Sequence, residues 1–153
     1  PQAGRMLDIG SGAGFPALPL KIVRPGLEVV SVDAVAKKIM FQRHVARSLH
    51  LEHFSAVHAR IEDCRQQALF GGGFDLVTAR AVGRLSLLVT MAAPLLKPGG
   101  ELVAMKGPEV VEELNVCREQ LVANGWSVRE EFLSLPLSGA ARCLVFVRRC
   151  PAG

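Results

Sequence analysis

Residues 8–14 of the chain read DIGSGAG, a stretch that combines one acid with three closely spaced glycines. Glycines are needed where a backbone turns tightly and a ligand approaches it with no Cβ atom in between. Gly14 follows Gly12 one residue sooner than in the dinucleotide-binding pattern G-x-G-x-x-G. Asp8, two residues before Gly10, repels a pyrophosphate but suits a ligand with an ammonium and a sulfonium. S-adenosylmethionine carries both groups, so the stretch favours this cofactor.

A second acid, Asp33, follows Gly14 by 19 residues and ends an apolar run. A carboxylate in that place can accept hydrogen bonds from both ribose hydroxyls of an adenosine. The alternative is an ordinary glycine-rich turn with an incidental aspartate. Asp8, Asp33 and a turn at residues 98–100 together weaken that alternative, because one cofactor-binding sheet would need all three. The glycine spacing and Asp8 also disfavour an NAD-dependent dehydrogenase.

The elements that must position these residues alternate between short apolar runs and helical stretches, which indicates a doubly wound α/β fold. The predicted strands cover residues 5–9, 27–32, 54–58, 74–79 and 101–105, with a terminal hairpin at 127–135 and 142–148. The predicted helices cover residues 16–23, 37–50, 85–96 and 109–124, with a breaker at 97–100. In the second helix, Phe41, Val45 and Leu49 share one apolar face, and Arg43 and Arg47 lie opposite. The fold class is therefore a seven-stranded, mostly parallel sheet with helices on both faces and an antiparallel hairpin.

Composition limits the classes of partner. The 153 residues suit one domain, and half of them are apolar. Eighteen Lys and Arg against 14 Asp and Glu give a net charge of +4, which permits a polyanionic partner but is equally explained by a solvated basic surface. The four cysteines form no Cys-x-x-Cys pair, so we expect buried thiols in a reducing compartment and no metal. Residues 85–96, the longest nearly apolar run, are shorter than the ~18 residues of a membrane span. We expect a cytoplasmic monomer without a membrane partner.

Several short motifs occur in one collinear order along the whole chain. They are DIGSGAGFP at residues 8–16, RIE at 60–62, ARA at 79–81, MKG at 105–107 and RCLV at 142–145. Together they resemble the RsmG (GidB) family of class I S-adenosylmethionine-dependent methyltransferases, which modify N7 of a guanine in 16S ribosomal RNA. The resemblance implies a Rossmann-like methyltransferase fold, rRNA (guanine-N7) methyltransferase activity, and 16S RNA or the small ribosomal subunit as the partner.

The resemblance also implies which residues hold the cofactor. By position, they are Asp8, Gly10, Gly12, Phe15, Asp33, Ile61, Glu62 and Arg80. Ile61 and Glu62 are expected to flank the adenine, where a backbone N–H and an apolar side chain suit a purine edge. Arg80 is expected between cofactor and substrate, because open α/β sheets bind ligands at the carboxyl ends of their strands. Core packing for Phe15 and a solvated loop position for Arg80 are the alternatives.

The chemistry at guanine N7 needs no general base, because N7 carries a free lone pair and no proton. Alignment and desolvation are sufficient for in-line attack. Arg80 and Lys106 are the candidates for positioning the guanine or its phosphate, as hydrogen-bond donors. Lys37 and Lys38 fall in the first turn of their predicted helix, where a cation opposes the macrodipole by roughly 0.3–1 kcal/mol. We interpret this pair as an RNA phosphate contact, with an ordinary basic surface as the alternative.

Two other functions stay open: a methyltransferase of the same class that acts on a small molecule or a protein, and a non-catalytic nucleotide- or RNA-binding module. Ala17 stands where the family commonly has another glycine. The helical segment that normally precedes the first strand in the family is absent from this sequence. We therefore expect residues 1–153 to form a single methyltransferase domain that lacks an N-terminal helical segment. If that segment seats the RNA, the chain is expected to bind cofactor yet methylate poorly.

Overall fold

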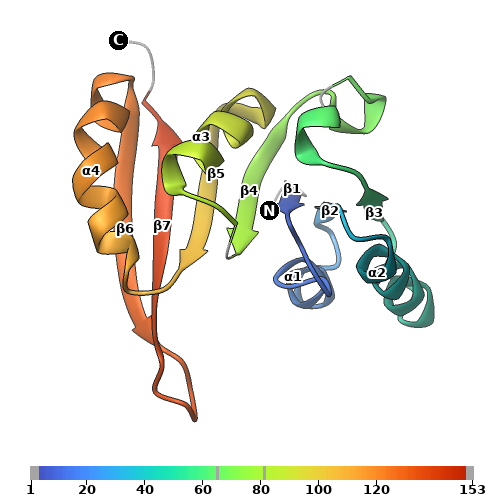
Figure 1. Cartoon of the computed structure of the whole chain (residues 1–153). Coiled ribbons are helices and arrows are strands. Elements are labelled where there is room, and N and C mark those ends of the chain that lie inside the picture. Colours follow the sequence, from blue (N-terminus) through green and yellow to red (C-terminus); the bar gives the residue numbers. More distant parts are fainter. Residues whose placement is uncertain (1–3, 65, 81, 151–153) are drawn as a thin grey trace.

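The computed structural model describes residues 4–64, 66–80 and 82–150. Ala81, the last residue of the predicted ARA motif, and the two ends of the predicted 1–153 domain lie outside the described residues. One seven-stranded sheet runs through the molecule in the order β3-β2-β1-β4-β5-β7-β6 (Figure 1). The strands are β1 (Arg5–Ile9), β2 (Glu28–Asp33), β3 (Phe54–His58), β4 (Phe74–Arg80), β5 (Leu96–Lys106), β6 (Trp126–Ser134) and β7 (Ala141–Arg149).

The first five strands pair in parallel, and β7 inserts antiparallel between β5 and β6. Four α-helices connect the strands: α1 (Ala17–Val23), α2 (Ala36–Ser48), α3 (Leu85–Ala92) and α4 (Val110–Ala123). Three short 3-10 turns complete the elements: η1 (Ile61–Asp63), η2 (Ala68–Phe70) and η3 (Ala93–Leu95). Right-handed crossovers run one way from β1 and the other way from β4, so α1 and α2 cover one face and α3 and α4 the other. The predicted fold class is confirmed.

The apolar face predicted for α2 is not the face that the helix buries. Phe41 and Leu49 are half exposed, whereas Ile39 and Gln42 are the buried residues of this helix. The amide of Gln42 bonds to Ser31 on β2 and to Ser11 and Gly12 in the loop after β1. Buried hydrogen bonds of Gln42 and apolar packing of Ile39 together hold α2 in its observed rotation.

The predicted breaker before the fifth strand is also placed differently. Residues 97–100 belong to β5, and α3 ends at Ala92. The register shifts here, because Phe74 pairs with Leu96 while Leu76, two residues on, pairs with Glu101. The extra residues form a bulge in β5, which proline and glycine permit.

The main apolar core lies between the sheet and the two helices α3 and α4. The inward-facing strand residues pack there against Leu85 and Leu88 of α3 and against Leu114 and Leu121 of α4. These strand residues include Leu7, Ile9, Val30, Val77, Ala79, Leu102, Ala104, Trp126 and Val145. No helix in the described part of the chain combines the length and apolar character that crossing a bilayer requires.

Candidate active site

The glycine loop after β1 is the centre of the site, and its three glycines have different tasks. All three have positive φ angles: 64° at Gly10, 59° at Gly12 and 95° at Gly14. A Cβ atom on Gly14 would overlap the side chain of Leu18, whereas one on Gly12 would meet nothing within 4 Å. Gly14 therefore allows close packing of α1 against the loop, and Gly12 leaves the space in which a ligand can reach the backbone.

The end of β2 holds this loop in place. The backbone N–H of Gly12 donates to Oδ2 of Asp33 at 2.8 Å, and the N–H of Val35 donates to Oδ1 at 2.8 Å. The N–H of Ser11 donates to the carbonyl of Val32 at 3.1 Å. Each carboxylate oxygen of Asp33 keeps a second lone pair, which is the acceptor that a ribose hydroxyl needs. Asp33 thus both orients the loop and retains the capacity predicted for it.

Gln42 supports the loop from below and was not identified from the sequence. Its amide nitrogen donates to the carbonyl of Gly12 and to Oγ of Ser11, both at 2.7 Å. Its amide oxygen accepts from the hydroxyl of Ser31 on β2. A polar residue three positions after the buried Ile39 is the only signal that the sequence carries for it, because it places an amide on the inner face of the helix.

Asp8 lies near the end of β1, just before the glycine loop. It lines neither the cavity of about 280 Å³ nor the cavity of about 780 Å³ found at this end of the strands. The side chain is fully buried, and Oδ1 accepts a hydrogen bond from Thr78 at 2.7 Å. Oδ2 has no hydrogen-bond partner among the described residues. Burial raises the pKa of Asp8 to about 7, against the lowering effect of the Thr78 hydrogen bond. Oδ2 of Asp8 is therefore a buried acceptor that no described residue uses. A cationic group bound near this loop would stabilise the ionised form of the Asp8 carboxyl.

A cavity of about 280 Å³ opens beside the glycine loop, between the ends of β1 and β2 and the 3-10 turn η1. Its lining brings together Gly10, Ile61 and Glu62, as the sequence predicted. Val82, Leu87 and Met91 add apolar surface from the segment after β4 and from α3. Sequence reasoning missed these three, because only the parallel order of the sheet brings that segment next to η1. The mostly apolar lining with one acid suits a purine ring.

Arg80 and Phe15 meet at the mouth of the site. The guanidinium carbon of Arg80 lies 6.0 Å from the centroid of the Phe15 ring, within cation–π range. Both side chains are exposed, and Phe15 retains half of its accessible surface, so it is not a core residue. Arg80 also lines a second cavity of about 780 Å³, which extends from the end of β4 to the β6–β7 hairpin. Arg80 therefore connects the glycine loop with this larger cavity.

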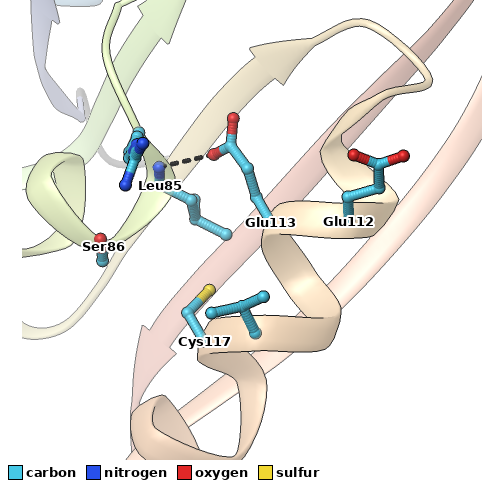
Figure 2. A pocket seen from close by; sticks show the side chains of 7 residues that line it. Leu85, Ser86, Glu112, Glu113 and Cys117 are labelled. Carbon is cyan, nitrogen blue, oxygen red and sulfur yellow. Dashed lines mark hydrogen bonds between the residues drawn. The ribbon is translucent and has the colours of Figure 1, made fainter.

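Lys106 lines the same large cavity, but its ammonium is already bound. The side chain is only 9% exposed, and Nζ lies 3.3 Å from both carboxylate oxygens of Glu113 on α4. It also donates to the carbonyl of Gly83. Glu113 in turn accepts the backbone N–H of Leu85 at 2.8 Å, and Figure 2 shows this contact across the hollow between α3 and α4. Lys106 thus connects three parts of the chain: the end of β5, the segment that precedes α3, and helix α4.

Lys37 and Lys38 are exposed in the first turn of α2, which carries no acidic residue. The helix starts just after the end of β2, on the same edge of the sheet as the glycine loop (Figure 1). Neither lysine lines one of the two cavities. No group of three or more His, Cys, Asp or Glu side chains within the described ranges is arranged to hold a metal ion.

The described residues fit S-adenosylmethionine in three respects. Gly12 offers an open backbone, the 280 Å³ cavity offers a place for a purine, and the buried Asp8 offers an unmatched acceptor. All three lie around the carboxyl ends of β1 and β2, where open α/β sheets bind ligands.

The chain matches proteins of one family along most of its length. The sequence profile of GidB, rRNA small subunit methyltransferase G, matches residues 1–134. The ribosomal RNA small subunit methyltransferase G of Syntrophotalea carbinolica is 50% identical, over 96% of this chain and 68% of that protein. The protein of the same name from Geobacter sp. strain M21 is 48% identical, over 95% of this chain and 67% of its own length.

Solved structures share the architecture. A predicted O-methyltransferase from Agrobacterium tumefaciens matches with a TM-score of 0.75 at 18% identity, covering 95% of this chain and 74% of that chain. At this identity the likeness concerns the fold alone, and the fold is that of the class I methyltransferases.

Proposed function

The chain belongs to the rRNA small subunit methyltransferase G family, and on this premise we propose that it transfers a methyl group from S-adenosylmethionine to N7 of a guanine in 16S ribosomal RNA. Membership makes the chain an rRNA methyltransferase. The target atom and the roles of individual residues are the proposed part.

One observation supports this proposal above the others: a small, mostly apolar cavity and a large, mixed cavity lie at the ends of neighbouring strands, and Arg80 of the large cavity contacts Phe15 of the glycine loop. S-adenosylmethionine supplies an electrophilic methyl group when it is bound. Gly10, Ile61 and Glu62 would hold its adenine in the small cavity, and Asp33 would accept its ribose hydroxyls. Phe15 and Gly12 would then lie along the path from the adenosine to the methyl group.

The residues of this chain have no proton to move in the proposed reaction. N7 forms the new bond to the methyl carbon with its own lone pair, while the bond from that carbon to sulfur breaks and its electron pair stays on sulfur. The positive charge passes from sulfur to the purine ring, so the site must align the two partners and exclude water. Arg80 would position the substrate directly, and Lys106 would hold the framework behind it.

We place the large cavity on the substrate side because its dimensions exceed those of the adenine cavity and its lining mixes arginines with apolar side chains. The proposed rRNA substrate also supports a cytoplasmic location for the reaction.

The decisive experiment is transfer of labelled methyl from S-adenosylmethionine to unmodified small ribosomal subunits, to their naked RNA and to a protein extract, followed by nucleoside analysis. Label recovered as 7-methylguanosine is the expected result, and the three substrates rank the preferred form. Label in protein or in a small molecule would assign a different substrate to the same fold. Cofactor binding without label anywhere would indicate a binding module.

A further inference from the structure

The cavity of about 780 Å³ is lined by side chains that can recognise a base, and the pairing of the strands determines where these side chains lie. Its described lining comes from β4, from the end of β5 and the turn after it, and from the β6–β7 hairpin. Arg80 pairs with Met105 in register, and Met105 pairs with Leu144, so these three side chains form one row across three strands. Because Cβ atoms at paired positions point to the same face, the row leads from the glycine loop toward the hairpin.

The hairpin closes the cavity on the far side. Leu133 and Arg142 are paired residues on β6 and β7, and both line the cavity, together with Leu135. Leucines and a methionine can contact the faces of a planar base, while the two arginines can bind phosphate oxygens.

Glu109 is the one carboxylate among the described residues that line this cavity. It lies at the start of α4, is exposed, and its carboxylate makes no hydrogen bond to another described residue. The carboxylate folds back over Gly107, where a Cβ atom would overlap it. Glycine at that position therefore makes room for the acid.

The orientation of a guanine follows from the reaction proposed above. If N7 faces the methyl group, the opposite edge of the purine presents two hydrogen-bond donors, N1–H and the exocyclic amine. A carboxylate has two oxygen acceptors side by side and matches this pair, whereas adenine offers an acceptor at N1 and would be repelled.

We propose that the cavity between the end of β5 and the β6–β7 hairpin holds the target guanine, and that Glu109 selects it by accepting hydrogen bonds from N1–H and the exocyclic amine. This inference rests on the proposed function and adds the residue that gives base specificity. A purely structural role for Glu109 at the helix start would resemble that of Glu112 and Glu113, the acids already present in the first turn of α4.

Inosine tests the proposal because it lacks only the exocyclic amine of guanosine. The substrate is unmodified small-subunit RNA transcribed with about one tenth of its guanosine replaced by inosine. After methylation, nucleoside mass spectrometry gives the ratio of 7-methylinosine to 7-methylguanosine, normalised to the ratio of the unmethylated nucleosides. Both products come from one reaction, so the ratio does not depend on how much of a variant is folded.

The wild-type chain should prefer guanosine over inosine by roughly 10- to 100-fold, the value of one hydrogen bond to a charged group. In Glu109→Ala the preference should fall to about one, because both carboxylate acceptors are lost, and in Glu109→Gln it should fall below the wild-type value, because one of the two acceptors is replaced by an NH2 donor. Glu112→Gln is the matched control, since Glu112 lies one turn along the same helix and points away from Leu85 in Figure 2; its preference should equal that of the wild type.

An unchanged preference in both Glu109 variants would overturn the proposal, as would a wild-type enzyme that does not distinguish the two bases. These results differ from failure of the proposed function, in which the wild-type chain would make no 7-methylguanosine at all.

Discussion

The two faces of the sheet are built on different principles. On the face covered by α3 and α4, the buried side chains form one continuous apolar cluster. On the face covered by α1 and α2, the buried residues include a polar group around the glycine loop, made up of Asp8, Ser11, Ser31, Asp33, Gln42 and Thr78. The apolar face provides most of the stability through burial, while the polar face uses buried hydrogen bonds to fix a loop in one conformation.

The largest effect on stability is expected from the apolar face. Leu88 on α3 is fully buried in the cluster, so Leu88→Ala should lower the free energy of unfolding by about 2–5 kcal/mol. Urea unfolding followed by the fluorescence of Trp126 measures this loss, because Trp126 is the only tryptophan and is buried in the same cluster. Cofactor affinity per folded molecule should stay unchanged. Val116→Ala, at a position 84% exposed on α4, is the control and should cost less than about 0.5 kcal/mol.

A pH-dependent effect is expected from Asp8 on the polar face. Its pKa is raised from 3.8 to about 7 in the folded chain by burial. Between these two pH values, Asp8 is protonated in the folded state and ionised in the unfolded state. The contribution of Asp8 to stability is therefore fully present below about pH 4 and is lost as the pH rises through 7. The shift corresponds to a loss on the order of 2–4 kcal/mol.

Asp8→Asn should remove this dependence, because the amide does not titrate. Urea unfolding at pH 5, 6, 7 and 8 compares the two chains, with other acids contributing equally to both. A wild-type stability curve that matches the Asp8→Asn curve at every pH would show that Asp8 titrates normally. Binding of S-adenosylmethionine should tighten with pH in the wild type only, since a cation near the loop favours the ionised carboxyl.

A smaller loss of stability, with a larger effect on binding, is expected from Gln42. Gln42→Met keeps the volume of the side chain but leaves the carbonyl of Gly12 and the hydroxyls of Ser11 and Ser31 without their amide partner. The free energy of unfolding should fall by about 1–3 kcal/mol. Cofactor affinity, measured by calorimetry, should fall by roughly tenfold, because the loop is no longer held in its binding conformation.

Gln120→Met on the exposed surface of α4 is the matched control and should change neither quantity. Equal cofactor affinity in Gln42→Met and the wild type would mean that the loop keeps its shape without the amide. The buried hydrogen bonds of the polar face would then contribute less to the conformation of the glycine loop than the structure indicates.

The apolar face was predictable from the sequence, and the polar face was predictable only in part. Strands β1 and β3 have the predicted limits, because polar or glycine residues bound each short apolar run. The glycine loop and Asp33 were found because their spacing follows from the geometry of a strand-to-helix turn. Gln42 and the orientation of α2 were missed, since a buried amide is chosen by partners on other strands and no periodicity reports it.

The residues that line the cavity of about 780 Å³ were likewise predictable only in part. Arg80 and Lys106 were identified from motifs next to strand ends, but Leu133, Arg142 and Glu109 become neighbours only through the insertion of β7 between β5 and β6. The ion pair of Lys106 with Glu113 likewise depends on where α4 crosses the sheet. Motifs therefore identify residues at the ends of strands, while the partners of those residues need the tertiary structure.

The smallest effect on stability is expected at the outer surface of the polar face. Lys37→Glu and Lys38→Glu place acids in the first turn of α2, which should stabilise the helix by about 0.3–1 kcal/mol each. If the two lysines contact RNA phosphates, each change should nevertheless weaken RNA binding and reduce the slope of log affinity against log salt by roughly 0.7–0.9.

Cofactor binding should stay intact in both lysine variants, because neither residue lines the adenine cavity. Arg24→Glu, an equal change of charge at the far end of α1, is the control for net charge alone. Filter binding to small-subunit RNA from 50 to 300 mM salt separates the two cases. A slope that changes as much in Arg24→Glu as in the lysine variants would assign the effect to net charge, and the outer face of α2 would then have no specific part in RNA binding.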